Sequence, residues 1–105
     1  MLRFETVSSR EMDKYVKNKN ALIIDVRDEK RYRQCHIRNA VNIPFERLSQ
    51  QYEKMPGNMI LVLYCEHGGT GILAAKELYD RGYVVRALIG GISGYRGAYR
   101  EYGEP

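Results

Sequence analysis

The stretch Met59-Ile60-Leu61-Val62-Leu63-Tyr64-Cys65-Glu66-His67-Gly68-Gly69-Thr70-Gly71 decides the fold of this chain. It begins with six apolar residues, continues with a cysteine and ends in a loop that contains three glycines. A short continuous apolar run is typical of a strand that is covered on both faces, as in a parallel sheet. Apolar residues at helical spacing follow from Ile72 to Tyr79, and Gly82 is placed to end that helix. We therefore expect a central strand, a glycine-rich loop and a helix in direct succession.

Four further segments have the composition of strands, namely 4–7, 21–26, 40–43 and 83–88. We expect a helix that begins at Ser8 in a capping box, a short helix capped by Asp28, a helix over 45–55 and a last helix over 92–102 capped by Ser93. The segment around His36 is expected to be a loop. This alternation predicts an α/β fold with three layers, in which helices cover both faces of a central, mostly parallel five-stranded sheet.

The size and composition of the chain indicate a single domain over residues 1–105. Its 44% apolar and 29% charged residues are typical of a soluble globular protein, and no apolar run approaches the roughly 20 residues of a membrane span. Residues 1–5 lack the features of a secretory signal, so we expect a cytoplasmic protein. The two cysteines, Cys35 and Cys65, are then expected to be reduced thiols.

The net charge of +4 comes partly from a cluster of basic residues in one part of the chain. The cluster comprises Arg27, Lys30, Arg31, Arg33 and Arg38. Such a cluster suits a small anion or an acidic protein partner. No helix carries a long Lys/Arg stripe and no nucleic-acid motif is present, so we expect no nucleic-acid partner.

The loop after Cys65 is the strongest candidate for a functional site, because ligands of parallel α/β folds sit at the carboxyl ends of strands. Glycines at 68, 69 and 71 allow successive N–H groups to point inward above a helix N-terminus, which makes an anion-binding nest. Such a nest stabilises a thiolate and favours a nucleophilic Cys65. Two alternatives are a small buried cysteine with a purely structural role and a phosphate loop, although the Lys-Ser/Thr pair of a nucleotide-binding loop is missing.

The length of the loop bears on which thiol chemistry it supports. Phosphatases of this architecture place an arginine after five loop residues to grip the phosphoryl oxygens, and Gly71 occupies that place here. A shorter loop without the arginine suits a smaller group, such as the outer sulfur of a cysteine persulfide.

The remaining site residues are assigned by their position. We expect substrate binding by Arg27 and by the loop residues Glu66, His67, Gly68, Gly69, Thr70 and Gly71. Asp25 and His36 are expected to support the site, and Cys35 is a candidate resolving thiol for Cys65. The spacing of cysteine and histidine matches no standard zinc pattern, so we expect no metal site.

Three segments in order resemble the rhodanese family over almost the whole chain. The first is Leu22-Ile23-Ile24-Asp25-Val26-Arg27 with Tyr32, His36-Ile37 and Ala40-Val41-Asn42-Ile43-Pro44. The second is Cys65 with Gly68 and the helix that contains Ala74-Ala75, Leu78 and Gly82. The third is Gly90-Gly91-Ile92 followed by Tyr95.

This resemblance implies a single-domain rhodanese fold and a sulfurtransferase that needs no cofactor. The implied reaction loads a sulfane sulfur from a donor such as thiosulfate onto Cys65 and passes it to cyanide, a thiol or a sulfur-relay protein. A non-catalytic binding or redox-sensing module of the same fold is the main alternative, and phosphatase or arsenate-reductase chemistry is a third. Glu66 departs from the family pattern: its charge is expected to oppose thiolate formation and to repel an anionic donor, which predicts slow turnover of thiosulfate.

Overall fold

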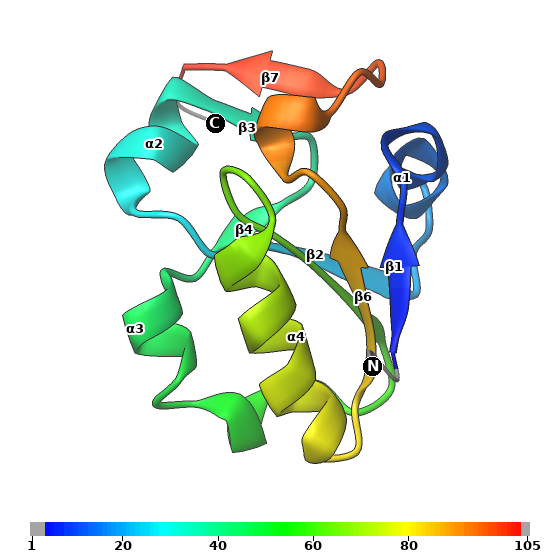
Figure 1. The fold of residues 1–105 in the computed structure, drawn as a ribbon, viewed down its shortest axis with the longest axis vertical. Coiled ribbons are helices and arrows are strands. Elements are labelled where there is room, and N and C mark those ends of the chain that lie inside the picture. The colour runs from blue at the N-terminus through cyan, green and yellow to red at the C-terminus, as the bar shows by residue number, and fades with distance from the viewer. Residues whose placement is uncertain (1–3, 104–105) are drawn as a thin grey trace.

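Five parallel strands form the central sheet of the computed structural model, which describes residues 4–103 (Figure 1). The strands are β1 (Glu5–Val7), β2 (Ala21–Asp25), β4 (Val41–Asn42), β5 (Ile60–Tyr64) and β6 (Val84–Leu88). Their spatial order is β1-β6-β5-β2-β4, and every neighbouring pair is parallel. The predicted five-stranded parallel sheet is confirmed, and each strand lies within the segment assigned to it. The prediction about residues 1–5 falls partly outside the described residues.

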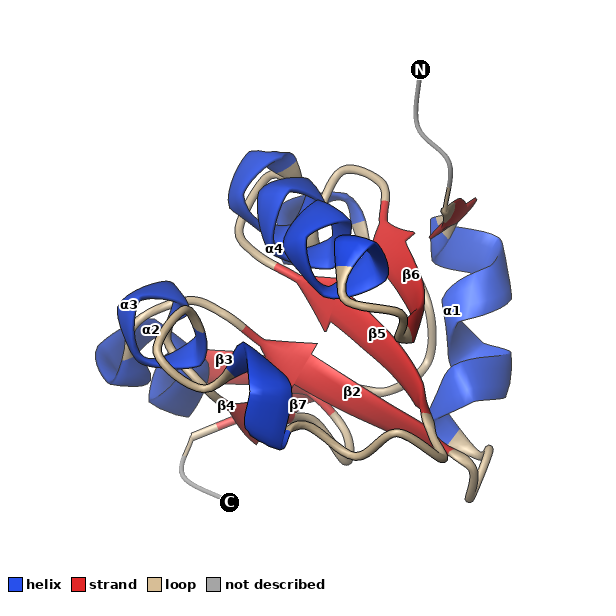
Figure 2. Ribbon diagram, turned by 90° about the horizontal axis from the view of Figure 1, so that it is seen from below, coloured by secondary structure: helices blue, strands red, loops and turns tan. Residues whose placement is uncertain are grey.

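Helices pack on both faces of the sheet, as predicted (Figure 2). They are α1 (Ser9–Val16), α2 (Glu29–Gln34), α3 (Phe45–Leu48) and α4 (Gly69–Asp80), with the short 3-10 helices η1 (Tyr52–Lys54) and η2 (Ile92–Gly94). The face of α3 and α4 encloses a core around Ile24, Leu61 and Leu63. The face of α1 encloses a second core around Ile23 and Val62. No helix within residues 4–103 is long and apolar enough to cross a membrane.

The beginnings of two helices follow from their capping residues. Ser8 Oγ accepts a hydrogen bond from the backbone N–H of Glu11 at 3.2 Å, and the Glu11 carboxylate accepts one from the Ser8 N–H at 3.1 Å. This is the predicted capping box of α1. The carboxylate of Asp28 accepts from the Arg31 N–H at 2.8 Å and caps α2 in the same way.

The predicted helix over 92–102 is wrong. Only the 3-10 turn η2 forms, and Arg100–Tyr102 is a strand, β7. The helix fails because side chains take its backbone partners: Ala98 N–H donates to the distant Asp13, and the guanidinium of Arg100, within the same segment, donates to the carbonyls of Ile92 and Tyr95. A regular helix uses those carbonyls for its own N–H groups. Ser93 is therefore not a helix cap.

Two further predictions about local structure are wrong. The segment around His36 is not a loop but strand β3 (Cys35–Ile37), which pairs antiparallel with β7, and the two ribbons lie side by side in Figure 1. Strand β3 escapes prediction because its partner lies more than 60 residues further along the chain. The predicted helix over 45–55 divides into α3 and η1, since Gln51 leaves the helical region with φ −139°.

Candidate active site

Cys65 follows the carboxyl end of β5 and lies at the bottom of a pocket of about 320 Å³. The pocket is bounded by the ends of β2 and β5, the beginning of α2 and the first turn of α4. Its lining residues are Val26, Arg27, Asp28, Arg31, Cys65, Glu66, His67, Gly69 and Thr70. Cys65 is 6% exposed and lines this pocket. Apart from the supporting residues Asp25 and His36, the sequence predicts eight site residues. Six of them line this pocket, namely Arg27, Cys65, Glu66, His67, Gly69 and Thr70.

The loop presents a backbone N–H to the sulfur. The N–H of Gly68 donates to Cys65 Sγ at 3.0 Å, directly before α4 begins at Gly69. Gly68 has φ +116°, which side-chain-bearing residues rarely adopt. Gly71 serves a different purpose. A Cβ at this position would lie 3.3 Å from the backbone of Tyr64 and Cys65, so the lack of a side chain lets α4 approach the end of β5. The Cys65 sulfur thus sits at the N-terminus of α4, where partial positive charge favours an anion.

The double glycine at 90 and 91 supports the loop from behind. The Ile92 N–H donates to the Cys65 carbonyl at 2.9 Å, and the Ser93 N–H donates to the Glu66 carbonyl at 3.0 Å. A Cβ at Gly91 would lie 2.5 Å from those carbonyl oxygens, and Gly91 has φ +61°. Ser93 Oγ also lies 2.9 Å from His67 Nδ1. Sequence reasoning missed this supporting role of Ser93, although the adjacent glycine pair marks the close approach.

Arg27 connects three parts of the site. Its guanidinium donates to both oxygens of the fully buried Asp25 at 2.8 to 3.2 Å, to Glu66 Oε1 at 3.0 Å and to the Cys35 carbonyl at 2.5 Å. Burial alone would lower the pKa of Arg27, but the hydrogen bonds and charge of Asp25, followed by the hydrogen bond to Glu66, raise it. Arg27 borders the pocket while most of its donors are already used. Asp25 lies behind it and orients it.

Glu66 does not stand as an isolated negative charge beside the thiol. Its carboxylate lies 3.0 Å from Arg27 Nη1 and 3.5 Å from Arg31 Nη1. Burial works to raise the pKa of Glu66, but the hydrogen bonds and charges of Arg27 and Arg31 outweigh it and lower the pKa below its ordinary value. Sequence reasoning missed Arg31 as a site residue, although its place in the basic cluster is a usable signal. The two arginines offset much of the charge that the sequence leads one to expect at Glu66.

His36 and Cys35 do not line the pocket. His36 is buried in β3, where it stacks on Tyr32 and its Nε2 lies 3.6 Å from Glu101. Cys35 is a free thiol whose Sγ lies 3.6 Å from an Arg100 nitrogen, and its link to the site runs through its carbonyl and Arg27. Within residues 4–103, no three His, Cys, Asp or Glu side chains gather in a way that could hold a metal ion.

Comparisons with known proteins match almost the whole chain. The family model described as a rhodanese-like domain matches residues 8–98. The thiosulfate sulfurtransferase GlpE of Coxiella burnetii (strain RSA 331 / Henzerling II) is 30% identical over 96 residues, which cover 90% of this chain and 90% of that protein.

Two solved structures extend the comparison to three dimensions. Reduced CoADR-RHD of Bacillus anthracis matches with a TM-score of 0.81 and 33% identity, over 88% of this chain and 16% of that much longer protein. The rhodanese-like domain protein of Staphylococcus aureus matches with a TM-score of 0.81 and 20% identity, over 94% of this chain and 98% of that one, and so agrees in fold. With its fold, its cysteine loop and its matched residues taken together, the chain belongs to the rhodanese family.

Proposed function

We propose that this chain is a sulfurtransferase that carries a sulfane sulfur as a persulfide on Cys65. The observation that carries the proposal is the N–H of Gly68 on Cys65 Sγ at the beginning of α4, in a member of the rhodanese family. The relatives named thiosulfate sulfurtransferase point to thiosulfate as one donor. Cyanide, a small thiol or a thiol on a sulfur-relay protein serves as acceptor.

The reaction consists of two displacements at sulfur. In the first, the Cys65 thiolate attacks the outer sulfur of thiosulfate, the sulfur–sulfur bond of the donor breaks, and sulfite leaves with the bonding electrons. In the second, the acceptor attacks the outer sulfur of the Cys65 persulfide, and the Cys65 thiolate leaves. Each step replaces one bond to the transferred sulfur with another, so no external oxidant or reductant is needed.

The loop supports both steps through backbone groups already in position. The outer sulfur of a persulfide is anionic, and it would lie in the pocket above Gly69 and Thr70, at the positive end of α4. The hydrogen bonds from Ile92 and Ser93 hold the loop and its N–H groups in place. These N–H groups therefore need little reorganisation when negative charge develops on the sulfur, and such preorganised donors are the usual source of electrostatic stabilisation in enzymes. Arg27, held by Asp25, and Arg31 lie at the mouth, where Glu66 offsets part of their positive charge.

The direct test is mass spectrometry of the intact chain after incubation with thiosulfate. The expected result is a gain of one sulfur that persists in Cys35→Ser, is absent in Cys65→Ser, and disappears when cyanide is added. The absence of an adduct with thiosulfate and with an organic persulfide would show that the chain is not a sulfur carrier.

A non-catalytic binding or redox-sensing module of the same fold is the second candidate. The observation in its favour is the Glu66 carboxylate, which occupies the two arginines at the mouth of the pocket. The rate of Cys65 alkylation separates the two proposals. A rate several-fold above that of a free cysteine favours the enzyme, and a rate equal to or below it favours the module.

A further inference from the structure

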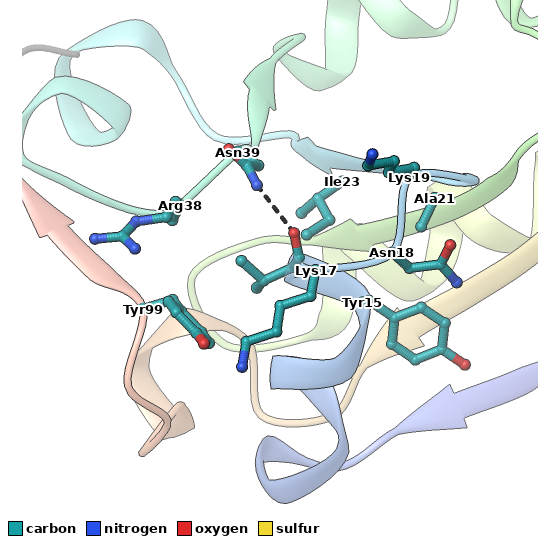
Figure 3. A pocket seen from close by; sticks show the side chains of 10 residues that line it. Tyr15, Lys17, Asn18, Lys19, Ala21, Ile23, Arg38, Asn39 and Tyr99 are labelled. Carbon is teal, nitrogen blue, oxygen red and sulfur yellow. Dashed lines mark hydrogen bonds between the residues drawn. The ribbon is translucent and has the colours of Figure 1, made fainter.

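A second hollow, of about 520 Å³, lies at the opposite end of β2 from the Cys65 pocket (Figure 3). It forms where the end of α1, the first residues of β2, the turn after β3 and the segment before β7 meet. Its lining residues are Tyr15, Val16, Lys17, Asn18, Lys19, Ala21, Ile23, Arg38, Asn39 and Tyr99. None of these residues lines the Cys65 pocket, so the two sites are separate.

The border of the hollow is positively charged. Lys17, Lys19 and Arg38 line it, and no carboxylate does. Neither lysine forms an ion pair with any carboxylate in the part of the chain that the structure describes. Arg38 Nε lies 2.7 Å from Glu101, which also faces His36.

The other carboxylate near the hollow is Asp13, which attracts the charge of Lys17. Its oxygens are occupied elsewhere, because one accepts from the Tyr95 hydroxyl at 2.5 Å and the other from the Ala98 N–H at 3.1 Å. The hollow therefore offers at least two ammonium groups that no protein carboxylate neutralises by direct contact.

The hollow is held in shape without a ligand. Asn39, at φ +70°, donates its side-chain amide to the Val16 carbonyl at 2.9 Å and so ties the turn after β3 to the end of α1. The Tyr99 ring lies 5.6 Å from the Lys17 ammonium and 5.3 Å from the Arg38 guanidinium. Figure 3 shows Lys17 extended toward Tyr99. Ala21 and Ile23 also line the hollow. These contacts leave cations and amides around the partly exposed side chains of Ala21 and Tyr99.

We propose that this hollow binds a small phosphomonoester with a flat apolar body, such as an aryl or nucleoside monophosphate. Its volume lies in the roughly 300–1,000 Å³ range of small-molecule sites. The lysines and the asparagine amides match the several oxygens and the double negative charge of a phosphate, and the partly exposed Ala21 and Tyr99 match the apolar body. Binding here is independent of Cys65 and of the sulfur-transfer reaction.

The test follows backbone amide shifts by NMR during titration of the full chain with naphthyl phosphate. Inorganic phosphate and naphthol serve as probes of the charge and of the apolar body alone. We expect naphthyl phosphate to bind more tightly than either, to shift the amides of Lys17, Lys19 and Asn39, and to behave in the same way in Cys65→Ser. We expect the affinity to fall as salt is added, since exposed charges are screened.

Two variants and one matched control complete the experiment. Lys17→Gln and Lys19→Gln should each weaken binding by about threefold or more at low salt, as expected for the loss of one charge contact near the surface. Lys30→Gln removes an exposed lysine outside the hollow and should change little. The proposal is overturned if the shifts map to the Cys65 pocket, if naphthol binds as tightly as naphthyl phosphate, or if all three variants weaken binding equally. Amide spectra of the free variants show that the fold is unchanged.

Discussion

Replacing Glu66 with glutamine removes one negative charge from the mouth of the thiol pocket and preserves the size of the side chain. Among the charged residues that line the pocket, Arg27 and Arg31 are balanced by Asp28 and Glu66. The substitution makes this set positive by one unit and releases donors of both arginines. An anionic donor should therefore enter the pocket more readily.

The size of the effect follows from Coulomb's law. A unit charge roughly 7 Å from a dianion contributes about 1–2 kcal/mol at an effective dielectric between about 40 and 80. In buffer of about 0.01 M ionic strength little of this is screened, whereas about 1 M salt removes most of it. We expect the kcat/KM for thiosulfate to rise about fivefold to thirtyfold at low salt and to converge on that of the unsubstituted chain at high salt.

A charge-selective alkylation measures the same field without depending on turnover. In a Cys35→Ser background, the rates of Cys65 alkylation by anionic iodoacetate and neutral iodoacetamide are compared. Their ratio cancels changes in the reactivity of the thiol, and it should rise about twofold to fivefold in Glu66→Gln at low salt. Glu77→Gln is the matched control, because Glu77 lies on α4, pairs with Arg81 just after the helix and does not line the pocket. An unchanged ratio, or an equal change in the control, would refute the reasoning.

Three further predictions concern stability, each measured by urea unfolding. Arg27→Lys breaks the fork that neutralises a fully buried carboxylate and should cost about 3 kcal/mol or more, whereas Arg31→Lys, at a side chain 57% exposed, should cost less than about 0.5 kcal/mol. Gly91→Ala places a Cβ against the carbonyls of the cysteine loop and should cost about 2–4 kcal/mol, against little change for Gly57→Ala, where a Cβ meets open space. Burial first, and then the hydrogen bond to Asp13, raise the pKa of Tyr95 to about 12, above the ordinary value of about 10. Its contribution to stability is therefore complete below about pH 10 and lost as the pH rises through about 12, so Tyr95→Phe should show a shallower loss over this range. A wild-type slope in Tyr95→Phe would contradict that account.

The parts of the fold that could be predicted from sequence are those that local patterns determine. The buried strands β2 and β5 are continuous apolar runs, and the capping box of Ser8 and Glu11 lies within four residues. The sequence also predicted that Asp25 and Cys65 lie at one edge of the sheet, because the carboxyl ends of parallel strands meet there. Local information was sufficient for the sheet and for most of the pocket.

The errors arose where distant residues decide the structure. The tyrosines at 95, 99 and 102 have helical spacing, but the Tyr95 hydroxyl bonds to Asp13, 82 residues earlier, and β7 pairs with β3. In the site, the expected effect of the Glu66 charge considered only the adjacent Cys65. The arginine that pairs with Glu66, Arg27, lies 39 residues away in the sequence. A local pattern contains no information about such partners.

The hydrogen bonds from Ile92 and Ser93 to the carbonyls of Cys65 and Glu66 also bear on the order in which parts of the fold form during synthesis. The cysteine leaves the ribosome well before the segment that holds its loop in place, and β1 must likewise wait for β6. Until residues 91–93 are synthesised, the carbonyls of Cys65 and Glu66 lack these hydrogen bonds, and the loop around the sulfur is not held in place. The pocket that we propose for sulfur transfer is therefore complete only after residues 91–93 have been synthesised.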